Sequence, residues 1–146
     1  MLTAAKLVAA LAFAALGWLA CVVLDDVMPE TTVRGRMLPV AVVCGLIAGW
    51  TISGAAKRAS MMEAAATGMR TSSTATLMAL MVLAVGAMLR DSLRGFYRKP
   101  MDAVLDVFDR FVDYGSLLMS IPVLGVVFLG GMLGGMLTEA VGRRWR

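Results

Sequence analysis

The chain has 146 residues, of which 60% are hydrophobic, and its mean hydropathy is +0.81. Soluble domains are roughly 45–50% apolar, so this composition excludes most soluble enzymes. Histidine is absent, which excludes histidine acid–base catalysis, His-dependent nucleophiles and the commonest metal ligand. The net charge of +4 does not indicate nucleic-acid binding, because all 14 Lys and Arg residues lie outside the apolar stretches, where they suit lipid headgroups.

Four stretches without a charged residue dominate the chain, and each is near the length that crosses a bilayer. A hydrocarbon core of about 30 Å needs about 20 apolar helical residues. The sequence therefore predicts an all-α, four-span transmembrane helical bundle that forms a single membrane domain over residues 1–146. The uncharged stretches are Leu7–Leu24, Met37–Ala56, Thr71–Leu89 and Tyr114–Thr138.

The end of the first stretch, Gly17-Trp18-Leu19-Ala20-Cys21, looks superficially like a lipoprotein cleavage site. Trp18 is bulkier than the aliphatic residue expected three positions before the cysteine, and the apolar run continues to Leu24. The basic region before the stretch is thin, with Lys6 as its one basic side chain. We therefore interpret the first span as a retained helix.

The connection before the last span has the pattern of an amphipathic helix. Pro100 suits the first turn of a helix, where its missing N–H costs nothing. Ser120 and Pro122 then indicate a new helix start, with Ser120 as the cap. We predict an amphipathic helix over 101–119 on the membrane surface and a last span over 121–140. Its apolar residues at helical spacing are Met101, Val104, Leu105, Phe108, Phe111 and Val112.

A four-span protein has both termini on one side of the membrane. The basic residues that set orientation are divided equally, seven on each side. The first helix favours cytoplasmic termini, because Lys6 flanks its start while Asp25 and Asp26 follow its end. The basic tail Arg143-Arg144-Trp145-Arg146 also suits a cytoplasmic interface.

Glycine spacing predicts where helices pack closely. Lipid tails provide no hydrophobic drive for helix association, so small residues spaced four apart let helix backbones approach. The contacts are expected inside the bundle or between copies in a homo-oligomer; other membrane proteins are the remaining candidate partners. The residues are Gly45 and Gly49, and then Gly130, Gly131, Gly134 and Gly135.

Two groups of side chains are candidate ligands. Four aspartates on one helix face could be a solvated surface, could pair with the Arg90, Arg94 and Arg98 stripe, or could bind a divalent cation. Two thiols in the first and second spans, at depths about 6 Å apart, could be ordinary apolar packing, a soft metal or metalloid site, or a redox pair. No cofactor is predicted. The metal candidates are Asp102, Asp106, Asp109, Asp113, Cys21 and Cys44.

Three segments in this order carry a family resemblance. They are Thr3-Ala4-Ala5-Lys6-Leu7-Val8-Ala9-Ala10 running into Gly17-Trp18, the acidic stretch from Met101-Asp102 to Tyr114-Gly115, and the closing Arg143-Arg144-Trp145-Arg146. With the four-span layout, the chain resembles the TrgA family of small inner-membrane proteins, named for an association with tellurite resistance. The resemblance implies a bacterial inner membrane and a link to tellurium oxyanion tolerance, and it supplies no catalytic or ligand residues.

Three functions remain open. The first is a tellurite-resistance-associated membrane protein that acts as a non-enzymatic envelope or interaction component. The second is a small transporter or channel subunit for an anion or metal ion, although the uncharged spans show no ion-pathway signature. The third is a thiol-dependent membrane redox factor.

Overall fold

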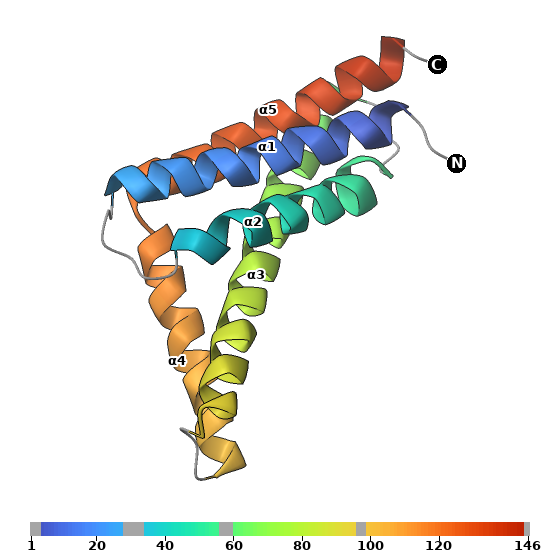
Figure 1. The fold of residues 1–146 in the computed structure, drawn as a ribbon. Coiled ribbons are helices and arrows are strands. Elements are labelled where there is room, and N and C mark those ends of the chain that lie inside the picture. Colours follow the sequence, from blue (N-terminus) through green and yellow to red (C-terminus); the bar gives the residue numbers. More distant parts are fainter. Residues whose placement is uncertain (1–3, 28–33, 56–59, 96–98, 145–146) are drawn as a thin grey trace.

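The computed structural model describes residues 4–27, 34–55, 60–95 and 99–144, and within these ranges the chain forms helices and no β-strand (Figure 1). Four of the helical segments are long and apolar enough to span a membrane. The predicted all-α fold class is confirmed, and the chain is a multi-pass membrane protein. In order, the elements are α1 (Ala4–Val27), α2 (Arg34–Ala48), the π-helical turn η1 (Gly49–Ser53), α3 (Met61–Leu93), α4 (Pro100–Leu118) and α5 (Ile121–Arg144).

The third helix begins well before the predicted span of 71–89. A capping box starts it: Ser60 Oγ accepts from Glu63 N–H at 3.2 Å, and the Glu63 carboxylate accepts from Ser60 N–H at 3.3 Å. Reciprocal bonds of this kind satisfy two otherwise unpaired donors of a first helical turn. The prediction counted uncharged residues alone, so it stopped at Arg70. The charged residues Glu63 and Arg70 lie within one continuous helix.

The other boundaries lie close to the predicted ones. The amphipathic helix predicted over 101–119 is α4, and the last span predicted over 121–140 extends to Arg144. Ser120 does not cap α5 with its side chain, because its Oγ is buried without a hydrogen-bond partner. Its carbonyl accepts from Leu124 N–H at 3.0 Å instead. The second span remains helical to Ser53, and its predicted end at Ala56 lies outside the described residues.

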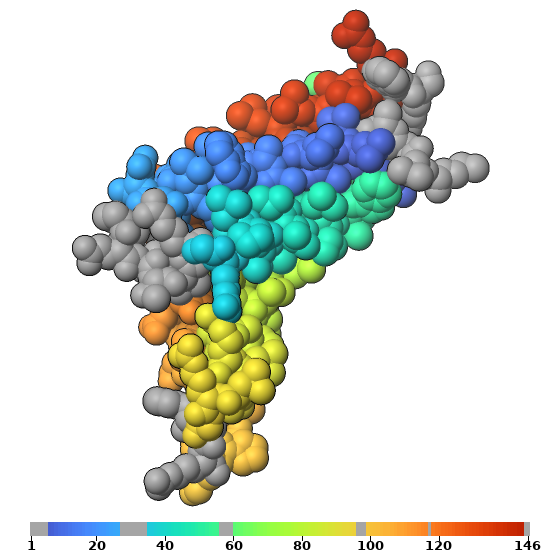
Figure 2. All heavy atoms as spheres, viewed as in Figure 1, coloured from blue at the N-terminus to red at the C-terminus, as the bar shows by residue number. Residues whose placement is uncertain are grey.

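Three helices form a layer that the fourth span crosses (Figure 1). α1 lies between α2 and α5 and runs antiparallel to both, while α3 packs obliquely on α5 and α2. α4 returns antiparallel to α3 and makes a V with it. We call the end of the layer where α1 begins and α5 ends the termini end, and the other the α4 end. Figure 2 shows the α3 arm of the V standing clear of the layer.

The apolar side chains divide between a small core and a large exposed surface. At the α4 end all five α-helices contribute to one buried cluster. Elsewhere the membrane-spanning helices expose large apolar side chains such as Leu11 at 65% and Leu133 at 61%. Such a surface is stable in lipid, where exposed apolar groups cost nothing. The core cluster is Leu24, Met37, Leu80, Leu83, Tyr114 and Val123.

The oblique path of α3 agrees with its length. Its 33 residues span about 50 Å, well beyond the ~30 Å of a hydrocarbon core. A helix longer than the bilayer is thick is accommodated by tilting. α3 therefore crosses at an angle, and its last turns extend sideways from the layer with α4.

Candidate functional site

Glycines bring α3 and α5 into backbone contact. A Cβ added to Gly68 would overlap the carbonyl oxygen of Gly131, and one added to Gly135 would overlap the carbonyl oxygen of Ala64. A Cβ on Gly131 would overlap Ser72 Oγ. Because the first two obstacles are backbone atoms, no side-chain rotation can relieve them. The contact requires glycine at these positions.

A second glycine contact sets the register of α1 against α2. A Cβ on Gly17 would lie 2.6 Å from Ala41 O, and one on Gly49 would lie 2.6 Å from Ala9 O. On the other side of α1, a Cβ on Gly134 would lie 3.2 Å from Leu16 Cδ1. The structure places all six glycines singled out by spacing at contacts between helices of one copy. They are Gly45 against Phe13, Gly49 against Ala9, Gly130 and Gly134 against Leu16, and Gly131 and Gly135 against α3.

This register separates the two cysteines. Since Gly45 meets Phe13, Cys44 lies level with Ala14, seven residues before Cys21 on α1. That is about 10 Å along the helix, rather than the 6 Å inferred by counting from the connection. The offset exceeds the reach of two thiolates that share one metal ion. Both cysteines are free thiols, and Cys44 is buried at 3% exposure.

A partly open cavity of about 80 Å³ lies between the four membrane-spanning helices. Small residues on α1, α2 and α3 leave the space, among them Gly17, Ala41 and Ala79. Most of its other lining is aliphatic or aromatic. The polar or soft side chains that reach it are Cys21, Ser72 and Thr76.

The hydroxyl groups at this cavity are engaged with their own helix. Ser72 Oγ donates to Met69 O at 3.0 Å, and Thr76 Oγ1 donates to Ser72 O at 2.9 Å. A buried water needs two to four polar partners, and an ion needs more. The cavity is therefore suited to methyl or methylene groups.

Filling this cavity is expected to stabilise the bundle. Ala79→Val adds two methyl groups to the lining, whereas Ala66→Val places the same β-branched residue on the exposed face of α3. At about 24 cal/mol per Å³, removing the whole void would contribute about 2 kcal/mol, which bounds the gain over the control. Reversible unfolding in bicelles measures the difference. A valine at 79 that destabilises relative to the control would contradict an empty cavity.

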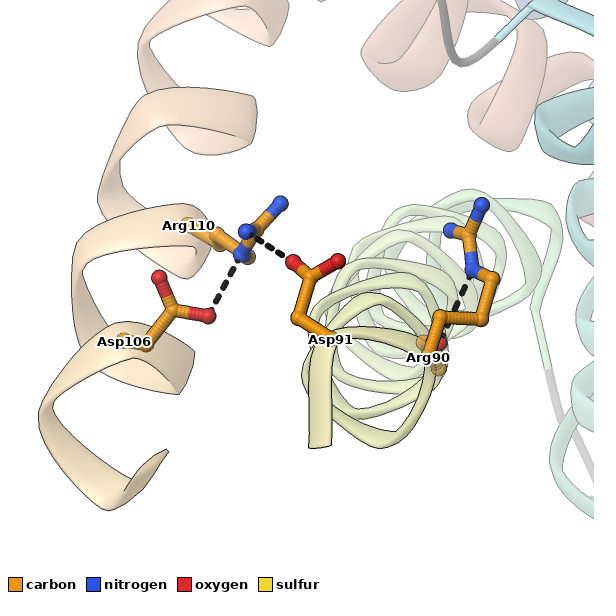
Figure 3. A network of polar contacts seen from close by, with 5 residues as sticks. Arg90, Asp91, Asp106 and Arg110 are labelled. Carbon is orange, nitrogen blue, oxygen red and sulfur yellow. Dashed lines mark hydrogen bonds and ion pairs between the residues drawn. The ribbon is translucent and has the colours of Figure 1, made fainter. Parts of the chain in front are cut away.

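Arg110 joins α4 to α3 (Figure 3). Its Nη2 donates to Asp91 Oδ2 on α3 at 2.5 Å, and its Nε donates to Asp106 Oδ2 at 2.6 Å. Arg110 and Asp91 are 32% and 25% exposed, so water screens the pair in part. The hydrogen bond to Asp106 is the largest cause that raises the pKa of the Arg110 guanidinium, with smaller contributions from Tyr114 and Asp91. The guanidinium therefore stays charged at any physiological pH.

The acidic stripe does not form a cluster of ligands. Asp106 turns towards Arg110, while Asp102, Asp109 and Asp113 are exposed on α4. Across the described ranges, no three Asp, Glu, Cys or His side chains are placed to hold one metal ion. Arg90 Nε donates to Gly86 O of its own helix at 3.1 Å, and Arg98 lies outside the described residues. The observed link between the helices has the carboxylate on α3 and the guanidinium on α4, the reverse of the pairing that was one of the three alternatives for the aspartates.

Two elements of the site were missed from sequence. Gly68 belongs to the series Ala64-xxx-Gly68-xxx-Ser72, whose spacing is the same as that of the recognised glycines. The i,i+4 spacing of Asp106 and Arg110 could have indicated their pair on α4, but the bond to Asp91, 19 residues away across a connection, carried no local signal. Comparison with protein-family models, curated proteins and solved structures finds no match to this chain.

Proposed function

We propose that this chain is a bacterial inner-membrane protein that acts as a non-enzymatic envelope or interaction component and is linked to tellurite tolerance. The link to tellurite rests on the sequence resemblance to the TrgA family. The described residues of two resembling segments lie in α1 and α4, and Arg143 and Arg144 of the third end α5. The non-enzymatic role is supported by a cavity whose hydroxyls are bonded to backbone carbonyls.

The exposed apolar face of α4 carries the proposal of an interaction role. Met101, Phe108 and Val112 are each about two thirds exposed, at 65%, 64% and 66%. An amphipathic helix with such a face needs lipid or a partner to cover it. α4 is therefore the amphipathic element that we propose contacts lipid or a partner.

We further propose that the termini end faces the cytoplasm. N and C termini lie at the same end of the layer (Figure 1). Lys6, Arg143 and Arg144 gather there, as cytoplasmic anchors do.

A deletion strain challenged with tellurite and with an unrelated envelope stress tests this function. Tolerance should return with the wild-type gene and with Cys21→Ala/Cys44→Ala. It should stay lost with Leu105→Gln/Phe108→Gln at equal membrane abundance, while Asp109→Asn restores it. The double glutamine variant removes the apolar face of α4 without entering the core, since both residues are exposed.

Three results would contradict the proposal. Loss of tolerance in the double cysteine variant would favour a thiol redox factor. Tellurite flux into vesicles that contain the purified protein would favour a transporter. A deletion strain as tolerant as its parent would remove the link to tellurite altogether.

A further inference from the structure

The surface of α4 is divided into three faces. One face turns to α3 and carries Arg110 and Tyr114. A second is apolar and exposed, and a third is acidic and exposed; residues three, four and seven apart share a face of a helix. The apolar face consists of Met101, Val104, Leu105, Phe108 and Val112, and the acidic face of Asp102, Asp109 and Asp113.

The direction of α4 suits a membrane interface. Figure 1 shows α4 running crosswise to α1, α2 and α5, beside the point where α1 ends and α5 begins. α1, α2 and α5 run side by side and indicate the direction of the bilayer normal, so a helix crosswise to all three lies near the membrane plane. α4 is thus placed in one leaflet, the one at the α4 end.

The other arm of the V is also apolar on its outer side. Leu77, Met81 and Leu89 of α3 are 57%, 53% and 54% exposed within the membrane-spanning stretch, where lipid is the surrounding solvent. The exposed apolar face of α4 lies beside this lipid-facing surface, because α3 and α4 pack against each other. Lipid is therefore the occupant that covers both arms.

We propose that the V of α3 and α4 is a wedge that inserts into one leaflet, with the apolar face of α4 among acyl chains and its carboxylates in water. α3 crosses both leaflets, whereas α4 adds protein cross-section to the leaflet at the α4 end alone. The lipid surface that fits this wedge is a loosely packed, outwardly curved leaflet. This inference rests on the membrane position proposed for α4 and not on the link to tellurite.

The charge of the polar face of α4 indicates which lipid headgroups the wedge prefers. Helices that bind anionic membrane surfaces carry Lys and Arg on their polar face. The exposed polar face of α4 carries aspartates instead, so anionic headgroups repel it. Insertion of the wedge is expected to fall as the anionic lipid fraction rises and to recover with salt.

The Arg110 bridge holds the wedge in register. Arg110 is bonded to a carboxylate on each arm of the V, at 2.5 Å to Asp91 and 2.6 Å to Asp106. The bond to Asp91 fixes the rotation of α4 about its own axis, and the bond to Asp106, within α4, holds the guanidinium in place. With α4 held in this rotation, Phe108 points away from α3 and the acidic face lies to one side.

Spin labels test the orientation of α4. In a Cys21→Ala/Cys44→Ala background, labels are placed at Phe108→Cys and at Asp109→Cys, two exposed neighbours on different faces. In vesicles of zwitterionic lipid, the label at 108 should be more accessible to oxygen than to a water-soluble nickel complex. The label at 109 should show the reverse. Equal accessibility at the two positions would overturn the wedge.

A second result would replace lipid with a different occupant. If the label at 108 is shielded from both reagents, and two such labels couple at short distance, a second copy covers the face and the proposal fails. Neither outcome depends on tellurite tolerance, so failure of the wedge and failure of the proposed function are distinguishable.

Membrane tubes pulled from giant vesicles test the curvature preference. With the α4 end outside, the wild type and Asp109→Asn should be enriched in the tube over the flat membrane. Leu105→Gln/Phe108→Gln should lose this enrichment while remaining folded, because both side chains lie on the exposed face. Equal density of the wild type in tube and flat membrane would overturn the proposal.

Discussion

Replacing Gly68 with alanine is expected to destabilise the bundle by about 1–3 kcal/mol, the range for overpacking a close contact. The new Cβ would overlap the carbonyl oxygen of Gly131, so α3 and α5 must move apart. Separation also loosens the contact between Ser72 and Gly131. Reversible unfolding in bicelles, monitored by helical circular dichroism, measures the loss.

Gly86→Ala is the matched control for this substitution. It lies on the same helix, and a Cβ there would meet no atom within 4 Å. Alanine is favoured over glycine in a helix by up to about 1 kcal/mol, so this variant should be neutral or stabilised. Equal effects at 68 and 86 would show that helix propensity, rather than the α3–α5 contact, sets the stability.

Breaking the Arg110 bridge is expected to open the V. Arg110→Met leaves Asp91 and Asp106 without the guanidinium that they share, and hydrogen bonds to charged groups contribute about 1.5–3 kcal/mol each. Partial exposure of both partners reduces the effect to about 1–2 kcal/mol. The distribution of distances between spin labels on α3 and α4, measured by pulsed electron paramagnetic resonance, should broaden.

A double-mutant cycle isolates the bond between the arms. Asp91→Asn and Arg110→Met should each open the V and lower the free energy of unfolding. The double variant should lower it by less than the sum of the two single variants. Asp102→Asn, an exposed carboxylate on the same helix, should leave the distances unchanged. Strict additivity of the two changes would show that Asp91 and Arg110 are not coupled.

The bridge is expected to be insensitive to alkaline pH. The pKa of Arg110 is raised in the folded protein by its hydrogen bond to Asp106. A raised pKa contributes stability that is fully present below the pKa of arginine in the unfolded chain, which lies far above the physiological range, and is lost as pH rises through the still higher folded value. Opening of the V below that pH therefore requires substitution rather than titration.

The helices could be predicted from sequence wherever one local signal set the boundary. α4 was found within one residue at each end, because Pro100 starts it and its apolar residues recur at helical spacing. The start of α3 was missed, since charged residues were taken as the limit of the span. The Ser60 and Glu63 capping box that begins it was nevertheless present in the sequence.

The candidate site was predictable in part. Spacing alone identified six glycines at helix contacts, since close approach depends on small residues at four-residue intervals. The partners of those glycines, the distance between the cysteines and the Arg110 bridge depend on how helices cross. Local sequence patterns do not give the angles at which helices cross, so these features could be identified only from the three-dimensional structure.

The length of α3 makes it a lever. It is held against α5 at Gly68 and again in the core cluster at Leu80 and Leu83, and ten residues, about 15 Å of helix, extend from Leu83 to Leu93 at the tip of the arm. When the bilayer thins or thickens, a long helix adapts by changing its inclination. A change of inclination about the core cluster moves the tip of the arm, so we expect a thinner or thicker bilayer to displace the start of α4.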